Sequence, residues 1–168
     1  FAQTIVGAWS MGDDDAGAAN GNAVNATLTA STGSDLSLAG SGLTYTNEVQ
    51  PQSSGGLAVQ FTGGGSYTIA SNLGLTNNFA METWVNFSSL ASTQWVMLVG
   101  NGASSGTGIL FSYDVNGSYL GVARSGDNVY FRTYDLSAGT WYHVALVVDE
   151  NAEASFYFNG NLVTGATI

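Results

Sequence analysis

The sequence predicts an all-β protein folded as a two-sheet antiparallel β-sandwich. No long stretch of the 168 residues has the periodicity of an amphipathic helix. Short apolar or alternating runs recur instead, and each is followed by Gly, Asn, Asp or Ser, as is typical of strands joined by turns. About a dozen such strands in a chain of this length indicate two packed antiparallel sheets and a single domain over residues 1–168.

In the first half of the chain, some segments have a clear strand pattern and others do not. An apolar run covers residues 4–11, and a polar stretch follows it. Residues 26–54 are loosely patterned, so we expect only one or two short strands there. The runs 57–61 and 67–69 flank three consecutive glycines, which predicts a hairpin with a glycine turn.

The second half predicts longer strands. Residues 79–87 alternate, with Trp84 on the face opposite to the apolar residues, and 95–99 is a short apolar strand. Residues 141–149 are apolar on both faces, so this strand should lie centrally with both faces covered. Two Asn-Gly dipeptides predict tight hairpins, because both residues tolerate positive φ. The runs they join are 107–114 with 119–123, and 155–158 with 162–163.

Composition excludes several classes of function. The chain has 12 acidic residues, two arginines and no lysine, for a net charge of -10. Nucleic-acid binding and docking to an anionic membrane both need clustered basic residues, so neither is expected. No apolar run is long enough to span a membrane, and the absence of cysteine excludes disulfides and thiolate chemistry. With only 8% charged residues, the solvated surface must consist largely of Ser, Thr, Asn and Gly.

Three segments carry a family resemblance in their order and spacing. The first is Ile-Val-Gly-Ala-Trp-Ser-Met at 5–11, followed by an Asp/Gly/Asn loop. The second is 57–69 with its three glycines, followed by Phe-Ala-Met-Glu-Thr-Trp-Val at 79–85. The third is Gly-Thr-Trp-Tyr-His-Val-Ala at 139–145, followed by Phe-Tyr-Phe-Asn-Gly at 156–160. Together they resemble the concanavalin A-like jelly rolls of the laminin G-like group, a fold that carries lectins, adhesion modules, enzyme appendages and structural proteins.

The resemblance also implies an incomplete sandwich. Such jelly rolls normally continue past the hairpin that corresponds to 156–163, with strands that close the fold. This sequence ends at 168. We therefore expect a jelly roll that lacks its C-terminal closing strand or strands, either because the chain continues or because another strand pairs at the open edge.

An acidic loop predicts a calcium site. Its carboxylate and amide oxygens, beside flexible glycines, are the ligands that calcium prefers, and the resemblance places calcium in the same loop of many relatives. The alternative is a solvated turn. The predicted ligands are Asp13, Asp14, Asp15, Asn20 and Asn22.

Aromatic residues suggest a carbohydrate site, since sugar rings pack on aromatic faces. In relatives, the strand motifs around Trp9, Trp84 and Trp141 form the core, so we expect these residues to be buried, and His143 with them. The middle hairpins often shape the concave sheet of this fold, and we place ligand contacts there. The predicted ligand-binding residues are Tyr113, Tyr119, Arg124, Tyr130, Arg132 and Tyr134.

No catalytic residues are expected. Glycoside hydrolysis needs paired carboxylates, and hydrolases with this fold usually carry a Glu-x-Asp-x-x-Glu strand, which is absent; Glu82 stands alone. His143 has no evident partner for nucleophilic catalysis. An enzyme that acts on polysaccharides is therefore the least favoured of three functional hypotheses, and the other two follow.

The leading hypothesis is a secreted, non-catalytic module for adhesion or carbohydrate binding, assisted by calcium if the acidic loop holds the ion. Its partner would be a glycan or an extracellular matrix or cell-surface component, at a bacterial surface or matrix. Phe1-Ala2-Gln3 fits the end of a signal peptide or simply the start of the chain. The alternative is a self-associating structural subunit of an extracellular fibre, sheath or matrix, with strands exchanged between subunits.

Overall fold

Fifteen β-strands make up the regular secondary structure of the computed structural model, within the residues that it describes. These residues are 4–51, 53–69, 73, 75, 78–90, 94–101, 107–114, 117–124, 127–129, 136–151 and 153–163. Within 94–129 the description covers the backbone pairing. The all-β prediction is confirmed. In this described part, no helix is long and apolar enough to cross a membrane.

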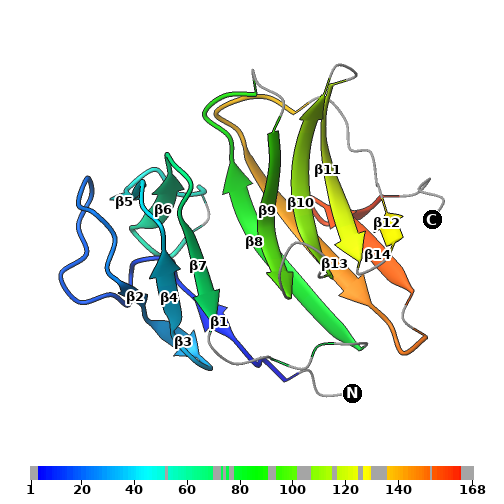
Figure 1. Ribbon diagram of the computed structural model, residues 1–168, viewed down its shortest axis with the longest axis horizontal. Helices are drawn as coiled ribbons and strands as arrows, with labels where there is room; N and C mark the ends of the chain where they lie inside the picture. Colours follow the sequence, from blue (N-terminus) through cyan, green and yellow to red (C-terminus); the bar gives the residue numbers. More distant parts are fainter. Residues whose placement is uncertain are drawn as a thin grey trace. The chain divides into compact units, whose positions relative to one another are not determined.

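The chain forms two compact units, which we describe separately: unit 1 is 1–73 and unit 2 is 74–168 (Figure 1). The single domain over 1–168 stays a prediction.

Unit 1 consists of small antiparallel sheets with short strands. Four of its strands lie between residues 26 and 54, where the sequence analysis expected one or two; that prediction was too low. Strands of two to four residues are too short to show alternation in sequence. The three sheets pair β1 (Ala8–Trp9) with β3 (Ala30–Thr32); the central β4 (Leu36–Ala39) with β2 (Thr27–Leu28) on one side and β7 (Ser66–Ile69) on the other; and β5 (Leu43–Thr46) with β6 (Ala58–Phe61).

The predicted hairpin between β6 and β7 is wrong. Strand β6 pairs with β5 and β7 pairs with β4, so β4–β5 and β6–β7 run beside each other as one interrupted antiparallel pair. At the interruption, the Thr62 N–H donates to the carbonyl oxygen of Gly42 over 2.7 Å. Gly42 has a φ of 86°, and a Cβ there would lie 2.8 Å from the Gly63 Cα. Gly42 and Gly63 therefore permit the close approach of two antiparallel backbones, and the glycine run does not form a hairpin turn.

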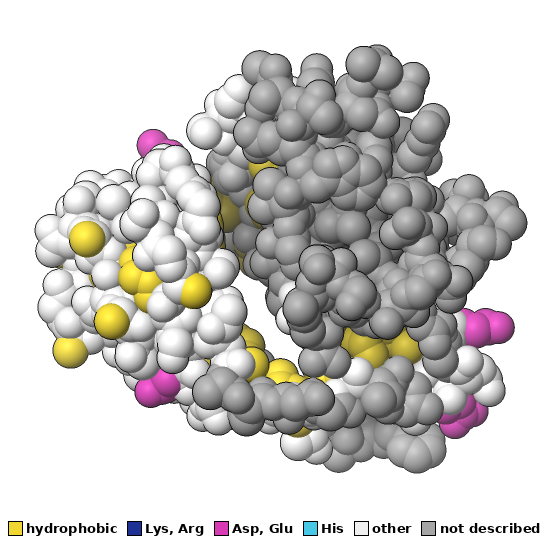
Figure 2. Space-filling model, viewed as in Figure 1, with side chains coloured by type: hydrophobic (Ala, Val, Ile, Leu, Met, Phe, Trp, Pro, Cys, Tyr) yellow, Lys and Arg dark blue, Asp and Glu magenta, His cyan; other side chains and the backbone are white. Residues whose placement is uncertain are grey.

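The core of unit 1 is small and centred on Tyr45. Val24, Leu43 and Tyr45 are buried and pack with half-buried apolar residues that include Leu57 and Tyr67. The Tyr45 ring also explains why residue 12 is a glycine. A Cβ at Gly12 would lie 2.9 Å from the ring, and its φ of 126° disfavours other residues. Figure 2 shows the surface of this unit as mostly uncharged polar atoms with scattered hydrophobic side chains, as the composition predicted.

Unit 2 contains two four-stranded antiparallel sheets, as the β-sandwich prediction requires. Figure 1 shows β9–β11 as one layer in front of β13 and β14, and β10 contacts β13. The first sheet is β12 (Asp127–Val129), β11 (Gly117–Arg124), β10 (Thr107–Asp114) and β9 (Gln94–Asn101). The second is β15 (Asn161–Leu162), β14 (Ala154–Phe158), β13 (Trp141–Val148) and β8 (Phe79–Asn86).

The strand pairing of both predicted hairpins is confirmed, but in the first one Gly117 already pairs with Asp114 and is therefore not a turn residue. Strand β10 pairs with β11, and β14 pairs with β15. In the second hairpin, Asn159 and Gly160 have φ values of 49° and 78°, so both central residues of the turn have the positive φ that this turn type needs.

The core of unit 2 lies on one face of the second sheet. Strand β13 is central, between β14 and β8, as predicted. Its alternate residues Tyr142, Val144, Leu146 and Val148 are buried, together with Leu136 and Phe156. The residues between them are half-buried or exposed, so the expectation that both faces of β13 are covered is wrong. This strand is apolar on two faces, but only one of them forms core.

Candidate ligand-binding face

The second sheet of unit 2 has a face turned away from its core, which we call the outer face. The register of β8 with β13 places Trp84 opposite His143 and Glu82 opposite Ala145. Alternation along each strand puts all four residues on the side away from the buried residues of β13. Adjacent strands thus bring an indole, an imidazole and a carboxylate onto one surface.

The outer face is also apolar and accessible. Trp84, Val147 and Leu162 are 43%, 37% and 51% exposed, and Tyr157 is half-buried. Exposed apolar side chains that share a face mark a candidate binding surface more strongly than scattered ones do. One row of cross-strand partners is Glu82, Ala145, Tyr157 and Leu162.

Trp84 corrects a prediction, because the sequence analysis placed it in the core. The core side chains of β8 include Phe79, Met81 and Val85, and Trp84 is out of phase with them. A tryptophan exposed in this way offers a flat apolar surface. Trp9 and Trp141, also expected to be buried, are half-buried.

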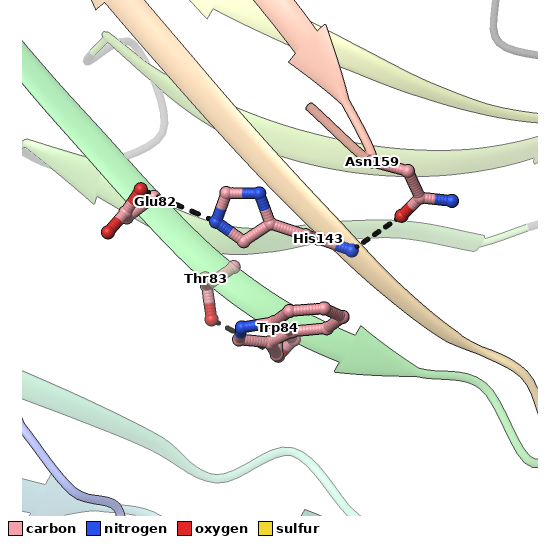
Figure 3. A network of polar contacts seen from close by, with 5 residues as sticks. All are labelled: Glu82, Thr83, Trp84, His143 and Asn159. Atoms are coloured by element: carbon pink, nitrogen blue, oxygen red, sulfur yellow. Dashed lines mark hydrogen bonds and ion pairs between the residues drawn. The ribbon is translucent and has the colours of Figure 1, made fainter. Parts of the chain in front are cut away.

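His143 links Trp84 to Glu82. Its Nε2 lies 3.3 Å from Oε2 of Glu82, and its ring centroid lies 5.1 Å from that of Trp84 (Figure 3). The side chain of His143 is 25% exposed and that of Glu82 is 71% exposed, so the histidine is not the core residue that we expected. It does have polar partners, and it holds the carboxylate beside the indole.

The Asn159 turn fixes the backbone at His143. The His143 N–H donates to Oδ1 of Asn159 over 2.9 Å (Figure 3). In return, the Asn159 N–H donates to the His143 carbonyl oxygen over 2.8 Å. On the next strand, the Thr83 hydroxyl donates to the Trp84 carbonyl oxygen over 3.2 Å. The outer-face residues are therefore carried by a well-anchored pair of strands.

The six predicted ligand-binding residues remain a prediction. Tyr113 lies on β10, while Tyr119 and Arg124 lie on β11. In the backbone register Tyr113 is opposite Ser118 and Tyr119 is opposite Ser112, which are successive rungs of the ladder. Tyr130, Arg132 and Tyr134 lie outside the described residues.

Asp13 and Asp14, both predicted calcium ligands, contact the protein itself. Oδ1 of Asp13 accepts hydrogen bonds from the backbone N–H groups of Gly56 and Leu57, over 2.8 and 2.9 Å. Oδ2 of Asp14 accepts one from the Ser10 hydroxyl over 2.7 Å. Asp13 thereby ties the acidic loop to residues more than forty positions later in the chain.

Asp15 is the buried member of the acidic loop. Only 7% of its surface is exposed. Its Oδ1 accepts from the Thr29 N–H over 2.6 Å, and its Oδ2 accepts from the Tyr45 hydroxyl over 2.7 Å. The same hydroxyl accepts from the Asn25 N–H over 3.0 Å. Asp15 is thus a structural centre that joins three segments of unit 1.

The two asparagines complete the predicted calcium set. Oδ1 of Asn20 accepts from the Asn47 N–H over 3.2 Å, and the carbonyl oxygen of Asn22 accepts from the Tyr45 N–H over 2.9 Å. Among the residues that the structure describes, no group of three or more His, Cys, Asp or Glu side chains is placed to hold a metal ion. Calcium binding stays a prediction for this loop.

Burial around Asp15 changes the acidity of two tyrosines. Desolvation, together with the Asp15 hydrogen bond, raises the pKa of Tyr45 above its ordinary value, against an opposing backbone hydrogen bond at Asn25. Desolvation likewise raises the pKa of Tyr67 to about 12, with smaller contributions from Tyr45 and Asp15. Both hydroxyls therefore remain protonated hydrogen-bond donors well into alkaline conditions.

The sequence analysis missed the outer face, although a signal was present. Glu82 and Trp84 are two residues apart on a strand whose other face is apolar, and this spacing places them side by side away from the core. Their link to His143 was not visible, because pairing between β8 and β13 joins residues about sixty positions apart.

Comparison with known proteins identifies the family but no individual relative. No curated protein and no solved structure matches the chain significantly. Residues 61–168 match a laminin G family model described as the concanavalin A-like lectin/glucanases superfamily. This match covers all of unit 2 and agrees with its two-sheet fold. The chain belongs to the concanavalin A-like lectin/glucanases superfamily.

Proposed function

We propose that the protein is a secreted, non-catalytic module that binds carbohydrate for adhesion, and that the outer face is its binding surface. The observation that carries this proposal is the exposed Trp84 indole beside the Glu82–His143 pair. Many members of a lectin-like family bind carbohydrate, and this face supplies the chemistry that such binding needs.

The outer face combines the two kinds of contact that hold a sugar. The C–H groups on one side of a pyranose ring pack on an aromatic surface, which Trp84 offers. Sugar hydroxyl groups need polar partners at the edge of that surface, and the Glu82 carboxylate accepts while the His143 imidazole can donate or accept. These side chains lie on paired strands, so the backbone does not have to become ordered on binding.

A carbohydrate array with matched variants tests this proposal. The wild-type protein, Trp84→Ala and Phe61→Ala are compared, because Phe61 is also an exposed aromatic residue but lies in unit 1. We expect wild type and Phe61→Ala to bind the same glycans, and Trp84→Ala to bind at least about tenfold more weakly. No glycan binding by wild type, or equal binding by Trp84→Ala, contradicts the proposal.

Calcium assistance is tested in the same experiment. The array is run with millimolar calcium and with a chelator, and the melting temperature is measured in both. The acidic-loop prediction expects calcium to raise the melting temperature and the chelator to lower it. No shift in either direction counts against calcium.

A second candidate function is self-assembly, as predicted from the sequence. Within the described pairing, β8 and β9 end their sheets and have eight residues each, whereas the opposite end strands β15 and β12 have two and three. Long end strands are where another chain can add a strand. Electron microscopy at high protein concentration, with calcium, tests this; uniformly dispersed monomers contradict it.

A further inference from the structure

We infer that the outer face selects uncharged pyranose sugars over uronic or sulfated ones, and that Glu82 sets this preference. This inference rests on the proposed function and adds the class of sugar. Its basis is the position of one exposed carboxylate, Glu82, beside the exposed Trp84 indole and in contact with His143.

Glu82 lies at the edge of the Trp84 platform. Two residues apart on one face of a strand, their backbones are separated by about 7 Å, which is the scale of one pyranose ring. A ring stacked on the indole therefore brings its peripheral groups to the carboxylate. The Glu82 side chain is 71% exposed, so it can meet them without a rearrangement of the strand.

The carboxylate has acceptor capacity for sugar hydroxyls. An ionised carboxylate offers about four acceptor positions and no donor. The His143 contact, at 3.3 Å, involves Oε2 and orients the group. Neighbouring hydroxyl groups of a neutral sugar can then donate to the remaining positions. Hydrogen bonds to an ionised acceptor are stronger than those between neutral groups, which favours a sugar rich in hydroxyls.

The same carboxylate repels an anionic sugar. Two like unit charges 4 Å apart in water repel by about 1 kcal/mol, which corresponds to about a fivefold loss of affinity. The rest of the chain adds to this effect, since its net charge is -10 and it contains only two arginines. Discrimination by a repulsive element of this kind is a common source of specificity.

The test uses two sugars that differ only at C6, where one carries a hydroxyl group and the other a carboxylate. One is a neutral glucan oligosaccharide, and the other is the same oligosaccharide with C6 oxidised to a carboxylate. Titration calorimetry at low salt should give at least about fivefold tighter binding of the neutral form to wild type. Glu82→Gln should bring the two affinities closer together, and 1 M salt should do the same for wild type, because salt screens exposed charges.

Glu153→Gln is the matched control, since it removes one negative charge from unit 2 at a hairpin away from the Trp84 platform. It should leave the affinity ratio unchanged, and all variants should keep the wild-type melting temperature. Equal or preferential binding of the anionic sugar by wild type, or an unchanged ratio in Glu82→Gln, overturns this inference while the proposed function stands. Wild type that binds neither sugar, nor any glycan on the array, overturns both.

Discussion

The two units are stabilised in different ways. Unit 2 has an apolar core in which Val144, Leu146 and Phe156 have no exposed surface. Unit 1 has a smaller apolar cluster built around Tyr45, whose hydroxyl contacts Asp15 and the Asn25 backbone. One unit relies on apolar side chains in strict alternation, and the other on a buried polar network that joins loops.

The difference shows why one unit can expose a binding surface. A sheet whose core face supplies most of the apolar burial can carry exposed residues such as Trp84 on its other face. The strands described in unit 1 are two to four residues long, so its stability depends on polar side chains that reach between short segments. Such residues are committed to structure and are less available to a ligand.

The largest expected effect is in the core of unit 2. Leu146→Ala should lower the free energy of unfolding by about 3 kcal/mol, because it leaves a cavity at a fully buried position. Val147→Ala, the next residue on the same strand, is 37% exposed and should cost less than about 1 kcal/mol. Urea unfolding measures both values. Equal costs would contradict the assignment of core and outer faces.

The buried polar network of unit 1 should give a somewhat smaller effect. Tyr45→Phe removes the hydroxyl that serves Asp15 and Asn25, and should cost about 2 kcal/mol because it leaves buried polar groups unpaired. Tyr67→Phe loses one part-buried hydrogen bond, to the Asn25 carbonyl oxygen, and should cost about 1 kcal/mol.

Hydrogen exchange tests whether the two units are stabilised separately. Tyr45→Phe should increase amide exchange in unit 1, and Leu146→Ala should increase it in unit 2. Uniform increases along the whole chain in both variants would show that the units unfold together, and would favour the single domain predicted from the sequence.

The sequence analysis was most successful where strands are long and least successful where distant backbones meet. The strand at 79–87 and the Asn159-Gly160 turn could be predicted because local sequence patterns specify them. The β4–β7 and β5–β6 pairings were missed, since the glycines that bring these backbones together resemble a turn in sequence. The acidic loop was singled out as a calcium site, which stays a prediction, and the contact of Asp15 with Tyr45 across thirty positions was not predictable from spacing.

Alkaline conditions should weaken unit 1 specifically. The pKa of Tyr67 is raised to about 12 in the folded state. As pH rises above about 10, the Tyr67 hydroxyl therefore loses its proton in the unfolded chain before it does so in the folded protein. The stability contribution is therefore present at neutral pH and is lost progressively between about pH 10 and 12. Urea unfolding at several pH values should show a shallower loss in Tyr67→Phe than in wild type. Identical slopes would contradict the role of this tyrosine.

The smallest expected effect concerns Asp13, and it separates a structural carboxylate from a calcium ligand. Asp13→Ala should cost about 1 kcal/mol, since the Gly56 and Leu57 N–H groups lose their acceptor but can reach water. Asp13→Asn keeps an oxygen acceptor and should restore most of this loss. Thermal melting of both variants is measured with calcium and with a chelator. If Asp13 acts only by joining the two loops, its substitution costs the same in both conditions. A cost that appears only with calcium identifies Asp13 as a ligand, because binding to the folded state alone is what links metal concentration to stability.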